Sequence, residues 1–223
     1  MHTTELIGPS GAGKTTVAQK LSKPSNVYAG RDGNDRARCF LKSLPAGELM
    51  TSLPYSFQRL ITRRIFPSVR SRYERAFFSK FPGALETIAA VVRNYEDKKS
   101  VLRYMFREAA WFEIHSNQLK DNERYLIDDG LYQFHLRLLP IDGWNPSEIM
   151  DRLYVPDELV FVNATAEICL SRQESRERGR ASKLEHLGRS DALAKLEIMQ
   201  TAAKEFLSEA KARGVDVKVV ETD

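Results

Sequence analysis

Residues 3–21 read TTELIGPSGAGKTTVAQKL and are the most informative segment of the chain for its fold. Its opening residues predict a strand over residues 3–7, and the run that starts at Lys14 predicts a helix over residues 14–21. Between them, GPSGAGKT matches the pattern GxxxxGK[ST] at every defined position. Strand, glycine-rich turn and helix follow in the order that a phosphate-binding loop requires, so a chance match of a turn before a helix is the weaker interpretation.

The loop residues have the chemistry that binding a triphosphate needs. Glycines let the backbone turn tightly, so that successive N–H groups face the phosphates and the helix N-terminus adds positive potential. Lys14 is expected to reach the β- and γ-phosphates as a catalytic residue, and the Thr15 hydroxyl is expected to ligate Mg²⁺. We therefore expect ATP to be bound by Gly8, Ser10, Gly11, Ala12, Gly13, Lys14, Thr15 and Thr16.

Strand and helix patterns alternate along the rest of the chain. Further strands are predicted over residues 26–29, 125–127, 158–162 and 215–220, and a last helix over residues 191–212. This alternation predicts an α/β fold with a five-stranded parallel sheet covered on both faces. Residues from about 34 to 122 show only helical spacing, so we expect one domain over residues 1–223 with a large helical insertion there.

Two adjacent carboxylates follow the strand at residues 125–127. Asp128 stands where a carboxylate can hold Mg²⁺ directly or through water, together with Thr15. Asp129 either accepts a proton from an attacking hydroxyl or caps the helix that begins near Leu131. The sequence favours the metal role for Asp128 and leaves both roles of Asp129 open.

An arginine-rich segment follows the strand at residues 158–162. Arg172, Arg176 and Arg180 recur at i, i+4 spacing, which predicts one face of a helix. Such arginines can grip phosphates, with Arg176 as a catalytic residue and the other two as nucleotide ligands, and a lid over about residues 172–189 could exclude water. The alternative is a helix whose arginines form ion pairs with Glu174 and Glu177 and bind no ligand.

Charge is placed unevenly in a chain whose net charge is only +4. Between Arg59 and Lys80 stand seven basic residues against Glu74 alone. The cluster indicates an anionic partner, which is a phosphorylated acceptor, a nucleic acid or an acidic surface, or else it is simply a solvated helical face. Because it lies inside the helical insertion, it favours an acceptor that carries phosphate or another anion.

The remaining composition excludes several classes of protein. Hydrophobic residues make up 42% and charged residues 29% of the chain, which is typical of globular proteins. No apolar run is long enough to span a membrane, and we expect a cytoplasmic protein without a membrane partner. Cys39 and Cys169 are expected to be reduced, buried thiols, and the four histidines to be packing or surface residues.

Taken together, these motifs resemble the P-loop nucleoside and nucleoside monophosphate kinases, especially the thymidylate kinase and deoxynucleoside kinase group. The resemblance covers the loop Gly8 to Thr15, Asp128, the segment Arg172 to Arg180 and the order of elements. It implies a sheet of order 2-3-1-4-5, a lid, and a helical region that holds the phosphoryl acceptor.

The resemblance also suggests residues near the acceptor. Thymidylate kinases have an Arg-Glu-Pro turn after strand two, and this chain has Gly30-Arg31-Asp32-Gly33 there, without the proline. By the resemblance, Asp32 orients or deprotonates the acceptor and Arg31 contacts an anionic group, unless both are simple turn residues. Asp129 stands where the group has an arginine, so an arginine expected near the acceptor is missing.

The function expected from the sequence is ATP- and Mg²⁺-dependent transfer of the γ-phosphoryl group to a small molecule, with a nucleoside or nucleoside monophosphate as the best guess. A sugar or other metabolite is an alternative acceptor. A nucleic-acid-directed ATPase or polynucleotide kinase is a second alternative and would use the basic cluster. A regulatory GTPase is disfavoured, because the chain has no Asn-Lys-x-Asp motif. The oligomeric state stays open, with a homodimer as one alternative.

Overall fold

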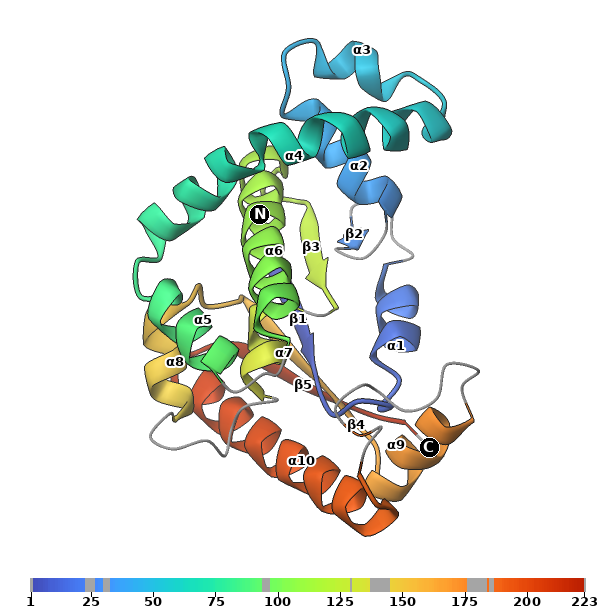
Figure 1. The fold of residues 1–223 in the computed structure, drawn as a ribbon, viewed down its shortest axis with the longest axis vertical. Helices are drawn as coiled ribbons and strands as arrows, with labels where there is room; N and C mark the ends of the chain where they lie inside the picture. Colours follow the sequence, from blue (N-terminus) through green and yellow to red (C-terminus); the bar gives the residue numbers. More distant parts are fainter. Residues whose placement is uncertain are drawn as a thin grey trace.

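The computed structural model describes residues 2–22, 27–29, 33–93, 97–128, 130–136, 145–175, 184 and 187–222. One or more helices stand between each strand and the next, and the longest helical stretch lies between the second and third strands (Figure 1). In chain order they are β1 (His2–Ile7), α1 (Lys14–Leu21), β2 (Val27–Ala29), α2 (Gly33–Lys42), α3 (Gly47–Thr51), α4 (Tyr55–Lys80), α5 (Ala84–Arg93), α6 (Lys98–Gln118), β3 (Arg124–Ile127), α7 (Leu131–Leu136), α8 (Pro146–Arg152), β4 (Glu158–Asn163), α9 (Ala166–Glu174), α10 (Arg189–Ala212) and β5 (Asp216–Glu221).

The strands form one parallel sheet in the order β2-β3-β1-β4-β5. The predicted α/β class with a parallel sheet is therefore confirmed. β1 lies at the centre, with Glu5 opposite Ile127 of β3 and Leu159 of β4. Because all strands run the same way, their carboxyl ends meet at one edge, where the loop after β1 and Asp128 after β3 come together.

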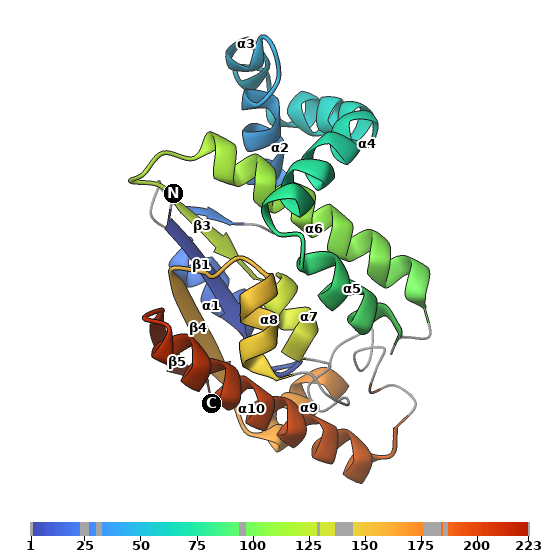
Figure 2. The same cartoon turned by 90° about the vertical axis from the view of Figure 1, so that its left-hand side faces the viewer.

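Helices cover both faces of the sheet, because alternate strand residues point to opposite sides. On one face, Ile7, Ile127 and Phe161 pack in a core with residues of α5 to α8 and α10. On the other, Leu6, Leu126 and Val160 pack with residues of α1, α9 and the start of α10. Figure 2 shows α1 on one side of the sheet and α6 and α7 on the other.

The described residues between β2 and β3 form helices and turns only. α4 packs against α6 and α2 around an aromatic core in which the Phe66 and Trp111 rings stack with their centroids 4.4 Å apart. This helical part matches the expected character of residues 34–122. The boundaries of an insertion and of a lid remain predictions.

The buried thiols and two of the histidines have packing roles. Cys39 and Cys169 are free and buried, and burial raises their thiol pKa values to about 12 and about 11. His115 and His135 are buried, and the Nδ1 atom of each is bonded to the backbone carbonyl four residues earlier. The predicted packing roles are confirmed for these four residues. Over the described residues, no helix combines the length and hydrophobicity that a bilayer crossing demands.

Candidate nucleotide-binding site

The loop between β1 and α1 has the backbone conformation that its glycines allow. Gly8, Gly11 and Gly13 have φ angles of 151°, 95° and 91°, which L residues rarely adopt. A Cβ atom on Gly8 would lie 2.3 Å from the Val162 carbonyl oxygen, and one on Gly11 would lie 2.2 Å from the Cys169 carbonyl oxygen. The loop is thus pressed against β4 and α9, so glycine is needed at both positions.

Lys14 begins α1 and turns its side chain back over the loop. Its Nζ atom donates hydrogen bonds to the carbonyl oxygens of Gly8 at 2.9 Å and Pro9 at 3.1 Å. Gly13 is the N-cap residue and has no side chain to cap the first turn of α1. A buried ammonium group and a helix N-terminus therefore meet at the loop, which is a suitable environment for phosphate.

Thr15 and Asp128 bring two oxygen ligands together from different elements. The Thr15 hydroxyl lies 3.4 Å from Oδ2 of Asp128, whose carboxylate is buried at the end of β3. A hydroxyl and a carboxylate are hard oxygen donors of the kind that Mg²⁺ prefers, and phosphate oxygens usually complete its coordination. The two residues fit the expected ion. Within the described residues no group of three His, Cys, Asp or Glu side chains forms a metal site.

α9 lies against the other side of the loop. The side-chain amide of Gln173 donates to the Ser10 carbonyl at 2.7 Å. Arg172 Nη1 donates to Thr222 Oγ1 at 3.1 Å, and that hydroxyl donates to the Ala12 carbonyl at 2.7 Å. Arg172 therefore lies beside the predicted phosphate site, and its role as a nucleotide ligand stays a prediction.

Several predicted site residues lie outside the described residues. They are Arg31, Asp32, Asp129, Arg176 and Arg180. α9 ends at Glu174, so the described helix carries Arg172 but not the two later arginines. The proposed helical face of three arginines, the lid and both candidate bases stay predictions.

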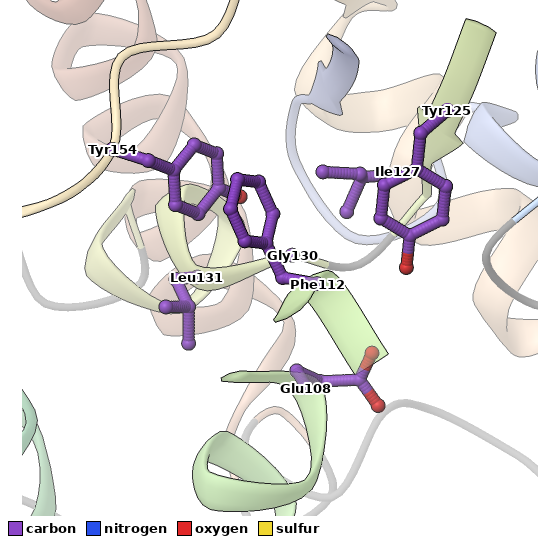
Figure 3. A pocket seen from close by; sticks show the side chains of 7 residues that line it. All are labelled: Glu108, Phe112, Tyr125, Ile127, Gly130, Leu131 and Tyr154. Carbon is purple, nitrogen blue, oxygen red and sulfur yellow. The ribbon is translucent and has the colours of Figure 1, made fainter. Parts of the chain in front are cut away.

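A small pocket lies near the end of β3, beside Gly130. It is lined by Glu108, Phe112, Tyr125, Ile127, Gly130, Leu131 and Tyr154 (Figure 3). The rings of Phe112 and Tyr154 stack with centroids 4.0 Å apart. Glu108 Oε2 accepts a hydrogen bond from Arg36 at 2.6 Å. The pocket thus combines aromatic faces with a carboxylate.

Both phenols of this pocket are neutral around neutral pH, and burial makes them still harder to ionise. It raises the pKa of Tyr125, and it raises that of Tyr154 together with the nearby Glu5 carboxylate. Both hydroxyls therefore remain hydrogen-bond donors around neutral pH.

Comparisons with known proteins found similarity only among solved structures. No protein-family model matches the chain, and no curated protein matches it. One similar structure is deoxyadenosine kinase from M. mycoides with bound dATP, at a TM-score of 0.48 and 13% identity over 98% of this chain and 90% of that chain. Another is the same kinase with the products dCMP and a flexible dCDP, at a TM-score of 0.41 and 14% identity over 99% and 89% of the two chains.

Both structural neighbours are deoxynucleoside kinases by name, the group that the sequence resembles. At these values the similarity establishes neither activity nor substrate for this chain. The function of this protein therefore rests on its own residues.

Sequence reasoning missed a buried polar network behind the loop, made by Glu5, Gln133 and Tyr154. Gln133 on α7 is fully buried and bonds to both the N–H and the carbonyl of Gly8. Glu5 on β1 is also fully buried and accepts a hydrogen bond from the Tyr154 hydroxyl. A carboxylate in a central, apolar strand is a signal that could have pointed to Glu5. Gln133 has no such signal in the sequence.

The basic cluster lies on α4, away from the pocket lining. Arg70 pairs with Glu74, and Lys80 bonds to Glu113 at 2.6 Å. The other five are exposed and pair with no acidic residue in the described part of the chain: Arg59, Arg63, Arg64, Arg72 and Arg75. Since none of them lines the pocket, the observed placement does not support a contact between this cluster and an acceptor bound there.

Proposed function

We propose that this chain is a kinase that transfers the γ-phosphoryl group of ATP to a small molecule. The observation that carries the proposal is the 3.4 Å approach of the Thr15 hydroxyl to the Asp128 carboxylate, beside the buried ammonium group of Lys14. These three groups lie around the loop on which a triphosphate would bind. They supply the positive charge and the oxygen ligands that phosphoryl transfer requires.

The residues of the chain divide the chemistry between them. Backbone N–H groups of the loop and Lys14 hold the phosphates in line with the acceptor. Thr15 and Asp128 would hold Mg²⁺, which when bound neutralises phosphate charge. The acceptor oxygen forms a bond to the γ-phosphorus as the bond to the β–γ bridging oxygen breaks, and ADP leaves. Where the acceptor is a hydroxyl, its proton passes to a carboxylate, for which Asp129 and Asp32 are the candidates.

Arginines complete the charge stabilisation in this proposal. Arg172 lies next to Gly13, since a Cβ atom on that glycine would be 3.6 Å from its Nη1 atom. Arg176 and Arg180 follow Arg172 in the chain and would close a lid of residues 172–189 over the nucleotide. An arginine supplied in this way can increase the rate by roughly 10³- to 10⁵-fold.

The pocket beside β3 supports a flat acceptor. Stacked Phe112 and Tyr154 offer aromatic faces, and the Glu108 carboxylate can accept hydrogen bonds from N–H groups of a heterocycle. We therefore place the acceptor between β3 and the helical region of residues 34–122, with a nucleoside or nucleoside monophosphate as the preferred class. A sugar would make less use of the aromatic lining.

A substrate screen tests this proposal. Nucleosides, nucleoside monophosphates and sugars are each incubated with the purified chain, Mg²⁺ and ATP labelled at the γ-phosphate, and products are separated by chromatography. We expect label transfer to at least one nucleoside or nucleotide. Binding of ATP without transfer to any small acceptor would overturn the kinase assignment.

The exposed arginines of α4 favour a second candidate, a nucleic-acid-directed phosphotransferase. Five exposed guanidinium groups on one long helix suit a phosphate backbone, and Phe57 at the start of α4 is 56% exposed. The test is binding of a fluorescent single-stranded oligonucleotide at increasing salt. Affinity that falls steeply with salt, together with transfer of label to its 5′ end, would favour this candidate over the small-molecule kinase.

A further inference from the structure

The side-chain amide of Gln133 is paired with both backbone polar groups of Gly8, and so with two successive peptide groups of the loop. Gly8 N–H donates to Gln133 Oε1 at 3.0 Å, and Gln133 Nε2 donates to the Gly8 carbonyl at 2.9 Å. Gln133 is 0% exposed and lies 125 residues from Gly8 in sequence. Because the two hydrogen bonds hold the peptide groups on either side of the Gly8 Cα atom, one buried amide fixes the backbone conformation of Gly8.

α7, which carries Gln133, is hydrogen-bonded to Glu5 of β1. Oε1 of Glu5 accepts hydrogen bonds from the backbone N–H groups of Tyr132 at 2.9 Å and Gln133 at 3.4 Å. Oε2 of Glu5 accepts one from the Tyr154 hydroxyl, and the Tyr132 hydroxyl donates to the Tyr154 carbonyl at 2.6 Å. Since Leu131 and Tyr154 line the pocket, the same buried network contacts the acceptor side and the loop.

The Gly8 carbonyl is shared between Gln133 and Lys14. It accepts Lys14 Nζ at 2.9 Å in addition to the amide of Gln133. To reach the phosphates, Lys14 has to leave this oxygen. A buried carbonyl that loses a partner is costly, so the remaining bond from Gln133 lowers the free-energy cost of that movement.

We infer that Gln133 is a positioning residue for nucleotide binding: it holds the N–H and the carbonyl of Gly8, and it remains the hydrogen-bond partner of that carbonyl when Lys14 turns to the phosphates. The inference rests on the proposed function. According to this inference, α7 positions the nucleotide-binding loop in addition to lining the acceptor pocket.

The test compares two buried glutamines of this chain. Gln133→Met removes both bonds to Gly8 with little change in volume. Gln58→Met is the matched control, because Gln58 is 4% exposed and donates to the Thr51 and Leu53 carbonyls at 2.9 Å and 2.8 Å, remote from the loop. Melting temperature and the dissociation constant for the Mg²⁺ complex of a non-hydrolysable ATP analogue are measured for both variants.

We expect both variants to lower the melting temperature, because each loses two hydrogen bonds of a buried side chain. Only Gln133→Met should weaken binding of the analogue, by about tenfold or more, and speed hydrogen exchange at the Gly8 amide. Equal affinity in wild type and Gln133→Met would overturn the inference. Failure of the wild-type chain to bind the analogue would overturn the proposed function instead.

A second variant covers the case in which Gln133→Met does not fold. Gln133→Glu keeps an oxygen for the Gly8 N–H but, when ionised, removes the donor to the Gly8 carbonyl. It should bind the analogue more weakly than wild type, and lowering the pH should narrow the difference as the new carboxyl gains a proton. Wild-type affinity across the pH range would count against the role assigned to Gln133.

Discussion

At the scale of single residues, Lys14 is the position where we expect a substitution to reduce turnover strongly. Its ammonium group bonds to two loop carbonyls, and the residue is 9% exposed, so Lys14 lies at the loop on which phosphates would bind. We expect Lys14→Ala to lower turnover by roughly 10²- to 10³-fold, because a charged donor to the developing negative charge is lost. The measurement is steady-state transfer with the acceptor found by the screen.

The control for this change is Lys20→Ala, on the exposed end of the same helix. It should leave turnover within about twofold of wild type, since surface substitutions of this kind change little. Similar losses in both variants would show that α1 had been disturbed, rather than that the Lys14 ammonium group acts on the phosphates.

Asp128 is the second residue whose replacement is informative. Asp128→Asn keeps the shape of the side chain but removes the charge that faces the Thr15 hydroxyl. The Mg²⁺ concentration for half-maximal turnover should rise roughly tenfold or more. Asp216→Asn, on the exposed strand β5, is the control and should leave it unchanged. If Asp128→Asn required the same Mg²⁺ concentration as wild type, Asp128 would not be a ligand of the metal ion.

At the scale of elements, the loop depends on close approach to α9. Gly11→Ala would bring a methyl group to 2.2 Å from the Cys169 carbonyl oxygen, whereas Gly214→Ala, also at positive φ, meets nothing within 4 Å. Gly214→Ala should therefore cost only about 1 kcal/mol in the free energy of unfolding, from backbone strain. Gly11→Ala should cost more and should also abolish binding of the ATP analogue. Urea unfolding measures the free energy of unfolding, and calorimetry measures the affinity for the ATP analogue. Unchanged affinity in Gly11→Ala would show that the close approach of Gly11 to α9 is not needed for nucleotide binding.

At the scale of the whole molecule, two buried histidines make stability depend on pH. Burial lowers the pKa of His115 to about 3 and that of His135 to about 4, from an ordinary 6.5. Between these values the unfolded chain binds more protons than the folded one, so stability falls as the pH drops below 6.5. By pH 4.5 the loss should be about 2 to 3 kcal/mol for each histidine.

Urea unfolding between pH 7 and pH 4.5 measures this loss. The double variant His115→Gln, His135→Gln should be less stable at pH 7, because each Nδ1 bond to a backbone carbonyl is removed. Its stability should nevertheless fall less steeply with decreasing pH. An identical slope in wild type and double variant would rule out these histidines as the source.

The basic face of α4 lies on a different part of the molecule from the pocket. Arg63→Ala combined with Arg64→Ala should leave the Michaelis constants for ATP and for a small acceptor within about twofold of wild type, since neither residue lines the pocket. Steady-state kinetics provide the measurement. If only the Michaelis constant for the acceptor rose, the result would show that the basic cluster contacts the acceptor after all.

The sequence by itself determined the parts of the site that are local in the chain. The strand, the glycines, Lys14 and Thr15 are consecutive, so their geometry follows from backbone sterics and hydrogen bonding over a few residues. Asp128 could be placed because parallel strands end at one edge of the sheet. The bounds of the strands shifted by about one residue, as expected where element ends fray.

Only the tertiary structure decided what supports the loop and what the pocket contains. Gln133 meets Gly8 across 125 residues of chain, and Tyr154 meets Glu5 across 149. Neither contact has a periodic signature, because each depends on how α7 and the residues before β4 pack on the sheet. The exposure of the α4 arginines was likewise set by packing, since α4 turns its opposite face to α6 and α2. The spacing of residues in the sequence indicates which side chains are neighbours on one helix or strand. The contacts of Gln133 and Tyr154 instead join different elements, which come together only in the folded core.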